Sequence, residues 1–378
     1  MCESAQNACP RQHFTDALVF PIICGGKRMC TSAKFVLLVL TIFGIALSPA
    51  HAEEFVCTSS PGLDRPFKNP TINLKYPAAE AFRESEGWSL FAINVAPDGS
   101  VSDVWLRDTL GSQTFGQIAA EALAKGKFDP PIRGGKPVQV GDVIAVIFQF
   151  DPKDRPGDHN YYREVLDRAA AARAQGDWKE AVRILDNSLA WPLHLHEMAT
   201  MSHSMAISYM GLKDWRRALH HIRRATIEGG TVAEQNVRGE ALALSVELHA
   251  RDHDYGRAIC IYETLRKLYP LAPVSPAVGA AIAETRAVLW SNAPVRTEVE
   301  ILEQGRSDLT PHWSHALLRS SFTIEQVQGA VKSYRLDCVG RSERAPVVPG
   351  ARITLSPGVA CDLFVIGDPG AKFVLDER

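Results

Sequence analysis

A short signature recurs three times between residues 160 and 270, and this repetition constrains the fold more than any other feature of the sequence. Each copy has an acidic residue, then an aromatic residue, then an alanine three positions after the aromatic. The copies carry Trp178 and Ala181, Trp215 and Ala218, and Tyr255 and Ala258. The aromatics are 37 and then 40 residues apart. This spacing favours stacked helical hairpins, because one helix pair cannot bury its apolar face but stacked pairs can.

The signature resembles the tetratricopeptide repeat, whose unit is about 34 residues. The small alanine lets the two helices of a hairpin approach closely, and the aromatic fills the start of the second helix. The copies are degenerate, since Ala172 and His249 stand where the second copy has Tyr209. We expect the array over residues 159–290. The resemblance implies a concave surface that binds peptides or proteins; the alternative is an array that only spaces its neighbours.

A strand pair is predicted ahead of the array. Trp88–Val95 is rich in aromatic and β-branched residues, and Val101–Arg107 returns after a turn. In that turn Asp98-Gly99 supplies the positive φ that a tight hairpin needs. Residues 70–87 are expected to add a short helix before the pair.

A helix and a long strand follow the hairpin. Residues 114–125 place their apolar side chains on one helical face, and the prolines at 130–131 end that helix. A loop at 134–137 leads into a long strand over 138–150. Both faces of this strand are apolar, which favours burial on both. The order of elements over residues 70–151 is therefore strand, strand, helix, strand.

This order of elements and residues resembles the TonB C-terminal domain family. The matching residues are Tyr76, Pro77, Gly87, Asp98, Gly99, Val101, Phe128, Pro130, Pro131, Gly135, Lys136, Pro137, Val138 and Phe148. The chain departs from the family at Asp108–Ser112, where Ser-Ser-Gly is usual, so that loop is less well predicted.

The resemblance implies a periplasmic domain that binds partners by strand addition, because an exposed sheet edge offers unpaired backbone groups. In TonB proteins the partner is a short peptide of an outer-membrane transporter, and it pairs with the last strand. The positions expected to bind a partner here are Tyr76, Pro77, Gln139, Val140, Gly141, Asp142, Val143, Ile144 and Ala145. The alternative, that the rest of the chain covers this edge, stays open.

An export segment is predicted near the N-terminus. Lys34 precedes an apolar run of 13 residues, Phe35–Leu47, and the A-x-A motif Ala50–Ala52 follows it. This is the pattern of a signal peptide cleaved after Ala52, and the run is short for a membrane span of about 20 residues. Residues 1–28 precede a natural alternative start at Met29. Residues 53–69 are expected to be a linker, and an uncleaved inner-membrane anchor is the alternative.

The tail, residues 295–378, returns to strand character between Gly and Pro residues. The candidate strands are 295–302, 322–327, 333–338, 351–355 and 361–365. Cys338 and Cys361 lie at strand ends, and an oxidising compartment favours a disulfide between them over two buried thiols. Cys260, on a helix of the third repeat, is expected to be a core residue without a partner.

Few residue patterns point to chemistry. The net charge of -2 gives no general attraction to nucleic acid, and no phosphate-binding loop, dinucleotide fingerprint or hydrolase elbow occurs. His249 and His253 have helical ligand spacing, but Ala250 stands where a zinc protease has Glu, so we expect no metal. The arginines of residues 216–217 and 223–224 are expected on a solvated helix face. No catalytic residue and no cofactor are predicted.

The sequence therefore predicts an α+β multidomain protein with a ββαβ TonB-type module, a helical array and a small β-rich C-terminal domain. The leading functional hypothesis is a non-enzymatic periplasmic binding or adaptor protein linked to envelope transport. Its expected partners are proteins or peptides of the bacterial envelope, outer-membrane receptors among them, and not nucleic acid or a small-molecule cofactor. The alternatives are a TonB-type energy transducer with an uncleaved anchor and a hydrolase in the C-terminal domain.

Overall fold

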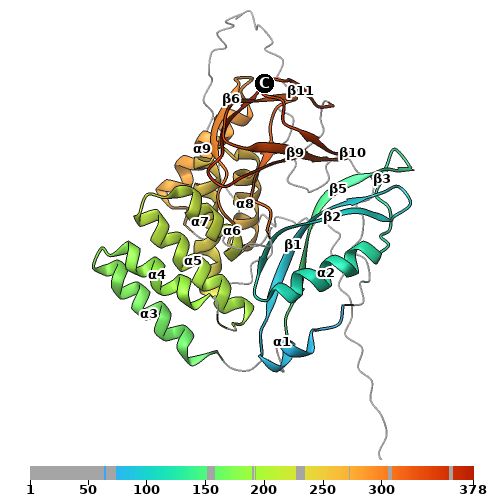
Figure 1. Cartoon of the computed structure of the whole chain (residues 1–378). Coiled ribbons are helices and arrows are strands. Elements are labelled where there is room, and N and C mark those ends of the chain that lie inside the picture. The colour runs from blue at the N-terminus through green and yellow to red at the C-terminus, as the bar shows by residue number, and fades with distance from the viewer. Residues whose placement is uncertain are drawn as a thin grey trace, which may run out of the picture. The chain divides into compact units, whose positions relative to one another are not determined.

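The first described part of the chain is a three-stranded antiparallel sheet with a helix packed on one face (Figure 1). The computed structural model describes residue 64 and residues 74–150, 158–189, 191, 193–226, 235–271, 273–304, 309–356 and 361–378. The sheet has the strand order β2-β1-β5. Its elements are α1 (Ala78–Phe82), β1 (Gly87–Val95), β2 (Val101–Leu110), α2 (Gln113–Lys125) and β5 (Val140–Phe148), with a small hairpin of β3 (Ile132–Arg133) and β4 (Lys136–Pro137).

Local chemistry explains why these elements form. Ser112 caps α2 by accepting a hydrogen bond from the backbone of Thr114. Gly99 lies in the turn between β1 and β2 with a φ of +84°. A Cβ atom at Gly87 would lie 2.5 Å from the carbonyl oxygen of Leu110, so only glycine lets the two strands and α2 approach this closely. The core between sheet and helix contains Phe91, Ile93, Val95, Phe115, Ala119, Leu123, Phe128, Val146 and Phe148.

Seven helices follow in the described residues and pack in sequence as antiparallel neighbours (Figure 1). They are α3 (Asn160–Ala174), α4 (Trp178–Ser188), α5 (Leu195–Gly211), α6 (Trp215–Thr226), α7 (Gln235–Arg251), α8 (Tyr255–Leu268) and α9 (Pro276–Leu289). The helical hairpins expected from the repeated signature are therefore present, with α4, α6 and α8 each beginning at a signature aromatic.

The turns inside the three hairpins share one geometry. In each, the signature aspartate donates its backbone N–H to a carbonyl five residues back, at Ala172, Tyr209 or His249. The residue before each aspartate has positive φ: Gly176 (+78°), Lys213 (+59°) and His253 (+58°). The three copies are thus structurally equivalent, although only the first uses glycine at the strained position.

Each signature aromatic contacts the next hairpin along the chain. Trp178 packs directly against Gly211 of α5, with no room for a side chain at the glycine. The ring of Trp215 lies 4.2 Å from the guanidinium of Arg251 at the end of α7. Tyr255 donates its hydroxyl to Glu284 of α9 at 2.8 Å. Each signature aromatic therefore adds a contact between its own hairpin and the helix that follows it.

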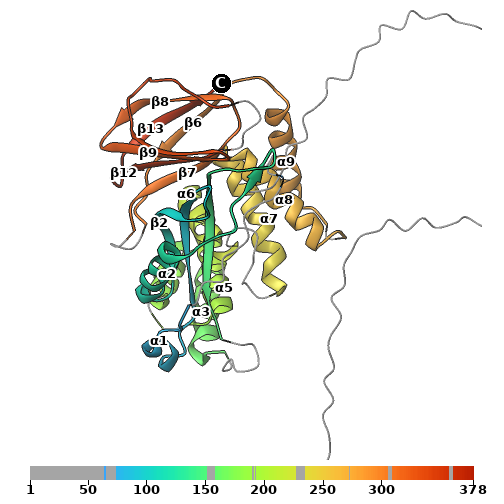
Figure 2. The same ribbon diagram turned by 90° about the vertical axis from the view of Figure 1, so that its right-hand side faces the viewer.

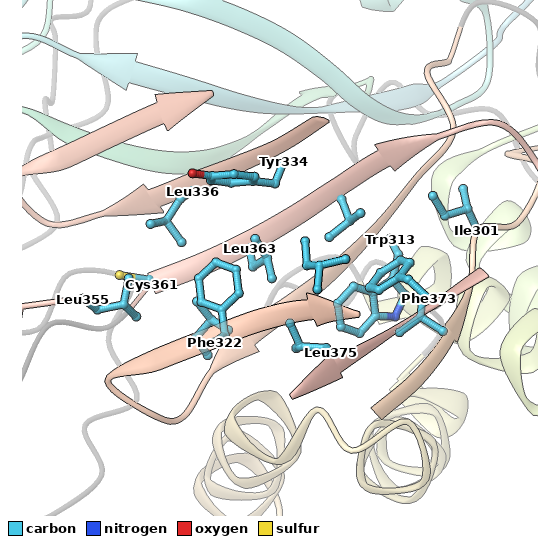
Figure 3. Packing of buried hydrophobic residues seen from close by; sticks show 14 of the residues in the cluster. Ile301, Trp313, Phe322, Tyr334, Leu336, Leu355, Cys361, Leu363, Phe373 and Leu375 are labelled. Carbon is cyan, nitrogen blue, oxygen red and sulfur yellow. The ribbon is translucent and has the colours of Figure 1, made fainter. Parts of the chain in front are cut away.

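The C-terminal part is a sandwich of two four-stranded antiparallel sheets (Figure 2). One sheet has the order β10-β9-β12-β7 and the other β11-β8-β13-β6. The strands are β6 (Val295–Glu300), β7 (His312–Leu317), β8 (Ser321–Gln328), β9 (Val331–Cys338), β10 (Arg341–Pro346), β11 (Ile353–Thr354), β12 (Cys361–Gly367) and β13 (Lys372–Glu377). Apolar side chains from both sheets, including Trp313, Phe322, Leu363 and Phe373, fill the space between them (Figure 3).

A disulfide joins the two central strands β9 and β12, as expected from the sequence. Cys338 and Cys361 face each other directly in the register, with Cα atoms 4.3 Å apart. Cys260 on α8 is also disulfide-bonded, which corrects the expectation of a core cysteine without a partner.

The predicted export segment and the 53–69 linker lie outside the described residues, apart from residue 64. Across the described ranges, no helix has both the length and the apolar character needed to cross a bilayer.

Candidate functional site

The strand β5 forms one edge of the three-stranded sheet. It pairs with β1 over nine consecutive positions, from Gly87 opposite Phe148 to Val95 opposite Val140, without a bulge. Past Val140, none of the described strands pairs with the other side of β5. A regular strand with an uncovered edge can accept an extended peptide by main-chain hydrogen bonding.

Two hydrogen bonds show which backbone groups point away from β1. Val143 donates its N–H to the carboxylate of Asp142 at 2.6 Å, and the carbonyl of Gln139 accepts from Gly340 at 2.8 Å. In an antiparallel ladder, alternate residues direct both backbone groups to the same side. Because the pairing with β1 is regular, Ala145 and Ile147 also direct their backbone groups outward.

The protein's own sandwich covers the beginning of this edge. The turn between β9 and β10 supplies the contact of Gly340 with Gln139 and an isolated antiparallel bridge between Val339 and Val140. Asp337 lies so near Gly141 that a Cβ atom there would be 2.6 Å from its carboxylate. Of the residues predicted to bind a partner, Gln139, Val140 and Gly141 therefore contact the protein's own chain.

Both faces of β5 are covered, as its two apolar faces predicted. Ile144, Val146 and Phe148 pack with the core beneath α2. Val143 and Ala145 pack into a second cluster with Trp88, Leu90 and residues of α3, α4 and α5. The edge itself is then the accessible part of the strand, together with Ile147, whose side chain is 44% exposed.

Tyr76 and Pro77 lie at the far end of β5. The Tyr76 ring stacks on Phe150 with centroids 5.1 Å apart and meets Phe148 edge to face. Its hydroxyl donates to the carbonyl of Ser85 at 2.6 Å, and burial raises the pKa of Tyr76. Pro77 caps the short helix α1. Tyr76 therefore packs against the end of β5, and Pro77 stands at the start of α1.

The face of the sheet opposite α2 is closed by ion pairs from the other two parts of the chain. Arg224 of α6 donates two hydrogen bonds to Asp108 of β2, at 2.8 and 3.0 Å. Arg335 of β9 pairs with Asp103 of β2. Arg224 is only 7% exposed, so the expectation of a solvated arginine face is wrong at this position, because the helix is buried against β2.

A buried polar cluster joins the helical array to the sandwich. The carboxylate of Asp254 contacts Arg223 at 3.3 Å, Arg257 at 2.9 Å and His249 at 3.2 Å, and accepts from the backbone of Ala316 in β7. Burial alone would raise the pKa of Asp254, but its cationic neighbours, Arg257 foremost, hold it well below its usual range. Burial also lowers the pKa of His249 to about 4.

The aspartate of the third repeat therefore differs from its counterparts. Asp177 and Asp214 accept hydrogen bonds from backbone N–H groups of the helices they precede. Asp254 instead binds two arginines of the array and a backbone N–H of β7 in the sandwich. His249 bonds to Asp254, and Nδ1 of His253 lies 3.2 Å from the carbonyl of Arg296, so the two histidines of the helical pair have different partners.

The repeat signature residues are structural. Ala181, Ala218 and Ala258 are fully buried between the helices of their hairpins. Sequence reasoning did not identify a group at the start of the array, His159, His194 and Glu197, whose ligand atoms lie within 4.8 Å of one another. Its only signal in the sequence was the closely spaced His194, His196 and Glu197.

Comparison with known proteins concerns the sheet and α2. Residues 72–150 match the sequence family described as Gram-negative bacterial TonB protein C-terminal. The solution NMR structure of the Pseudomonas aeruginosa TonB CTD is similar, with 24% identity over 22% of this chain and 87% of that chain and a TM-score of 0.20. No curated protein sequence matches the chain. The segment that contains the β5 edge, residues 72–150, therefore matches the TonB C-terminal family, and this match covers about a fifth of the chain.

Proposed function

We propose that this protein is a non-enzymatic periplasmic adaptor that binds an extended segment of an envelope protein along β5. The supporting observation is the edge beyond Val140, which is regular and has no strand partner in the described chain, while both faces of β5 are covered. The incoming segment would pair with the outward groups of Val143, Ala145 and Ile147. The TonB-type domain supports an envelope partner, with outer-membrane receptors as the first candidates.

The rest of the chain supports an adaptor over the two alternatives. The space between the sandwich sheets is filled with apolar side chains, and its buried acid–base pair, His315 with Glu377, is fully enclosed. Among the described residues of the sandwich, the His315–Glu377 pair is therefore not accessible to a substrate from solvent, which argues against its use as a hydrolase site. The 13-residue apolar run favours a cleaved signal over a transducer's anchor. N-terminal sequencing of exported protein distinguishes the two, since an intact 35–47 segment would favour the transducer.

Ile147 offers a matched pair of variants for the strand-addition test. Its side chain is exposed, and its N–H points away from β1, so Ile147→Pro removes an outward donor without breaking the sheet. Ile147→Ala removes the side chain and keeps the donor. The probes are synthetic peptides from the periplasmic N-terminal segments of outer-membrane receptors, with binding to the full chain followed by fluorescence anisotropy.

We expect Ile147→Pro to weaken peptide binding about tenfold, the equivalent of one net hydrogen bond of about 1.4 kcal/mol, and Ile147→Ala to change it much less. Amide exchange should slow at Val143, Ala145 and Ile147 when the peptide binds. Equal binding by the two variants, or protection confined to the helical array, would remove the edge from the proposal.

A further inference from the structure

The N-terminal ends of two helices of the array, α3 and α5, lie next to each other. His159 precedes α3 and His194 precedes α5, and Glu197 in the first turn of α5 lies between them. One oxygen of Glu197 accepts the backbone N–H of His159 at 2.7 Å. The other accepts the backbone N–H of His194 at 2.8 Å and lies 2.8 Å from Nδ1 of His159. Both imidazoles are therefore held beside one carboxylate.

The imidazole of His194 approaches Glu197 but makes no hydrogen bond among the described residues. The residue is fully buried, and neither ring nitrogen has a hydrogen-bond partner among the described residues. Its Nδ1 lies 3.8 Å from Glu197, and its ring centroid lies 4.6 Å from that of His159. Buried polar atoms are nearly always satisfied in folded proteins, and a species bound between this imidazole and its neighbours would satisfy it.

The charge around Glu197 indicates the sign of that species. The Glu197 side chain is fully buried, and in the described part of the chain its ion-pair partners are two histidines, with no lysine or arginine. A buried carboxylate requires a positive charge nearby. The N-termini of α3 and α5 supply only partial positive charge to it. A cation between Glu197 and the two rings would supply a full positive charge beside this carboxylate without protonation of either ring.

The donor set selects the kind of cation. Two imidazole nitrogens and one carboxylate oxygen, all within 4.8 Å of one another, suit a tetrahedral transition metal better than Mg²⁺ or Ca²⁺, which prefer oxygen ligands. The partly exposed pair of Asp158 and His196, 2.9 Å apart, lies next to the group and shares Glu197 with it. That pair gives the ion a route from solvent.

We propose that His159, His194 and Glu197 bind a Zn²⁺ ion, with the fourth position open toward Asp158 and His196. This replaces the expectation from the sequence that the chain has no metal site. The ion would link His159, which precedes the first helix of the array, to the start of the second hairpin. It would also reach the sheet, because Glu86 next to β1 accepts the N–H of Leu195 at 2.8 Å. The site would therefore set how firmly the TonB-type domain is attached to the array.

The test uses the full chain stripped of metal with a chelator. Isothermal titration measures Zn²⁺ binding, and Co²⁺ substitution reports the geometry through its visible absorption. His194→Phe keeps the buried ring and removes both nitrogens. His253→Asn is the matched control, because His253 lies on another hairpin with positive φ, which asparagine tolerates. His159→Gln provides a second ligand variant should His194→Phe fail to fold.

We expect one Zn²⁺ per chain, a melting temperature that rises with Zn²⁺ concentration, and tetrahedral Co²⁺ bands. His194→Phe and His159→Gln should lower the affinity at least about 100-fold, since even residues that only orient ligands cost 10–100-fold. His253→Asn should bind as the native chain does. Absence of equimolar binding, or unchanged affinity in a folded His194→Phe or His159→Gln, would overturn the proposal. Failure of this test leaves the peptide-binding result at Ile147 unaffected.

Discussion

The two edges of the TonB-type sheet are built differently. β2 is irregular, with two register shifts in its pairing with β1 and a positive φ of +76° at Asp103. Its charged residues Asp103 and Asp108 pair with arginines of the sandwich and the array. β5 pairs with β1 without a shift and carries one charged residue, Asp142.

The difference shows that a sheet can protect one edge and leave the other available. Bulges and charges are the devices by which natural sheets prevent unwanted strand pairing, and β2 has both. β5 has no bulge and a single charged residue, Asp142, and among the described residues the turn between β9 and β10 covers its beginning. The following predictions test whether the β2 side is the closed side and the β5 side the open one.

The largest effect is expected at Arg224, which pairs with Asp108 of β2 on the face of the sheet opposite α2. Arg224→Leu leaves Asp108 with 16% side-chain exposure and no arginine, so unfolding free energy should fall by about 3–5 kcal/mol. Urea unfolding measures the change. The control is Arg217→Leu, whose guanidinium is 58% exposed and pairs with Asp214; it should cost under about 1 kcal/mol. Similar costs for the two variants would mean that the Asp108 joint contributes little.

The second effect concerns the covered beginning of β5. Gly141→Ala places a Cβ atom 2.6 Å from a carboxylate oxygen of Asp337, which Arg335 and Ser342 hold in place. This overpacking should cost about 1–3 kcal/mol. Gly279→Ala in α9 is the control, because nothing lies within 4 Å and alanine favours a helix. The two substitutions should shift the urea midpoint in opposite directions. An unchanged midpoint in Gly141→Ala would mean that the turn between β9 and β10 does not pack against β5.

The smallest effect is a pH dependence of the joint between the array and the sandwich. His249 stays neutral when folded because burial lowers its pKa to about 4, whereas the unfolded chain takes up the proton near the ordinary value of 6.5. Stability is therefore unaffected above pH 6.5 and falls as the pH drops from 6.5 toward 4. His249→Gln removes this titration and keeps a donor for Asp254. The loss of unfolding free energy between pH 7 and pH 5 should shrink by about 1–2 kcal/mol in the variant. An unchanged pH profile would assign the acid sensitivity to other groups.

Local patterns in the sequence predicted many of the elements. The hairpin of β1 and β2, the helix α2 and the long strand β5 follow from alternation, Asp98-Gly99 and the double proline, and the structure confirms them within a few residues. The repeated signature located the starts of α4, α6 and α8. The pairing of Cys338 with Cys361 is also confirmed. Each of these features is determined by residues close together in the sequence or by a regular spacing between similar residues.

Three strands of the sandwich were not predicted, for identifiable reasons. β7 contains His312 and His315, and β10 is charged and ends at Pro346, as suits the edge strand that it is. β13 lies at the C-terminus, where Lys372 and Asp376 interrupt its apolar run. Each owes its strand conformation to tertiary pairing, which local propensity does not contain.

The cluster of His159, His194 and Glu197 at the start of the array was also not predicted from the sequence. His159 and His194 are far apart in the chain, and they meet only because α3 and α5 begin side by side. Likewise, nothing in the repeated arginines distinguishes Arg224 from Arg217, since their roles depend on where α6 meets β2. Contacts of this kind arise from packing between distant segments.

The turn at Gly340 has one more consequence, because it acts as a built-in stop for an added strand. It occupies the edge at Gln139 and Val140, and the stretch of this edge that no described strand pairs runs from Val143 to Phe148, about 20 Å at 3.3 Å per residue. A partner strand bound as proposed would fit along this stretch. A longer one would have to displace the turn at Gly340 from Gln139 and Val140, so the turn would limit the length of segment that the edge accepts.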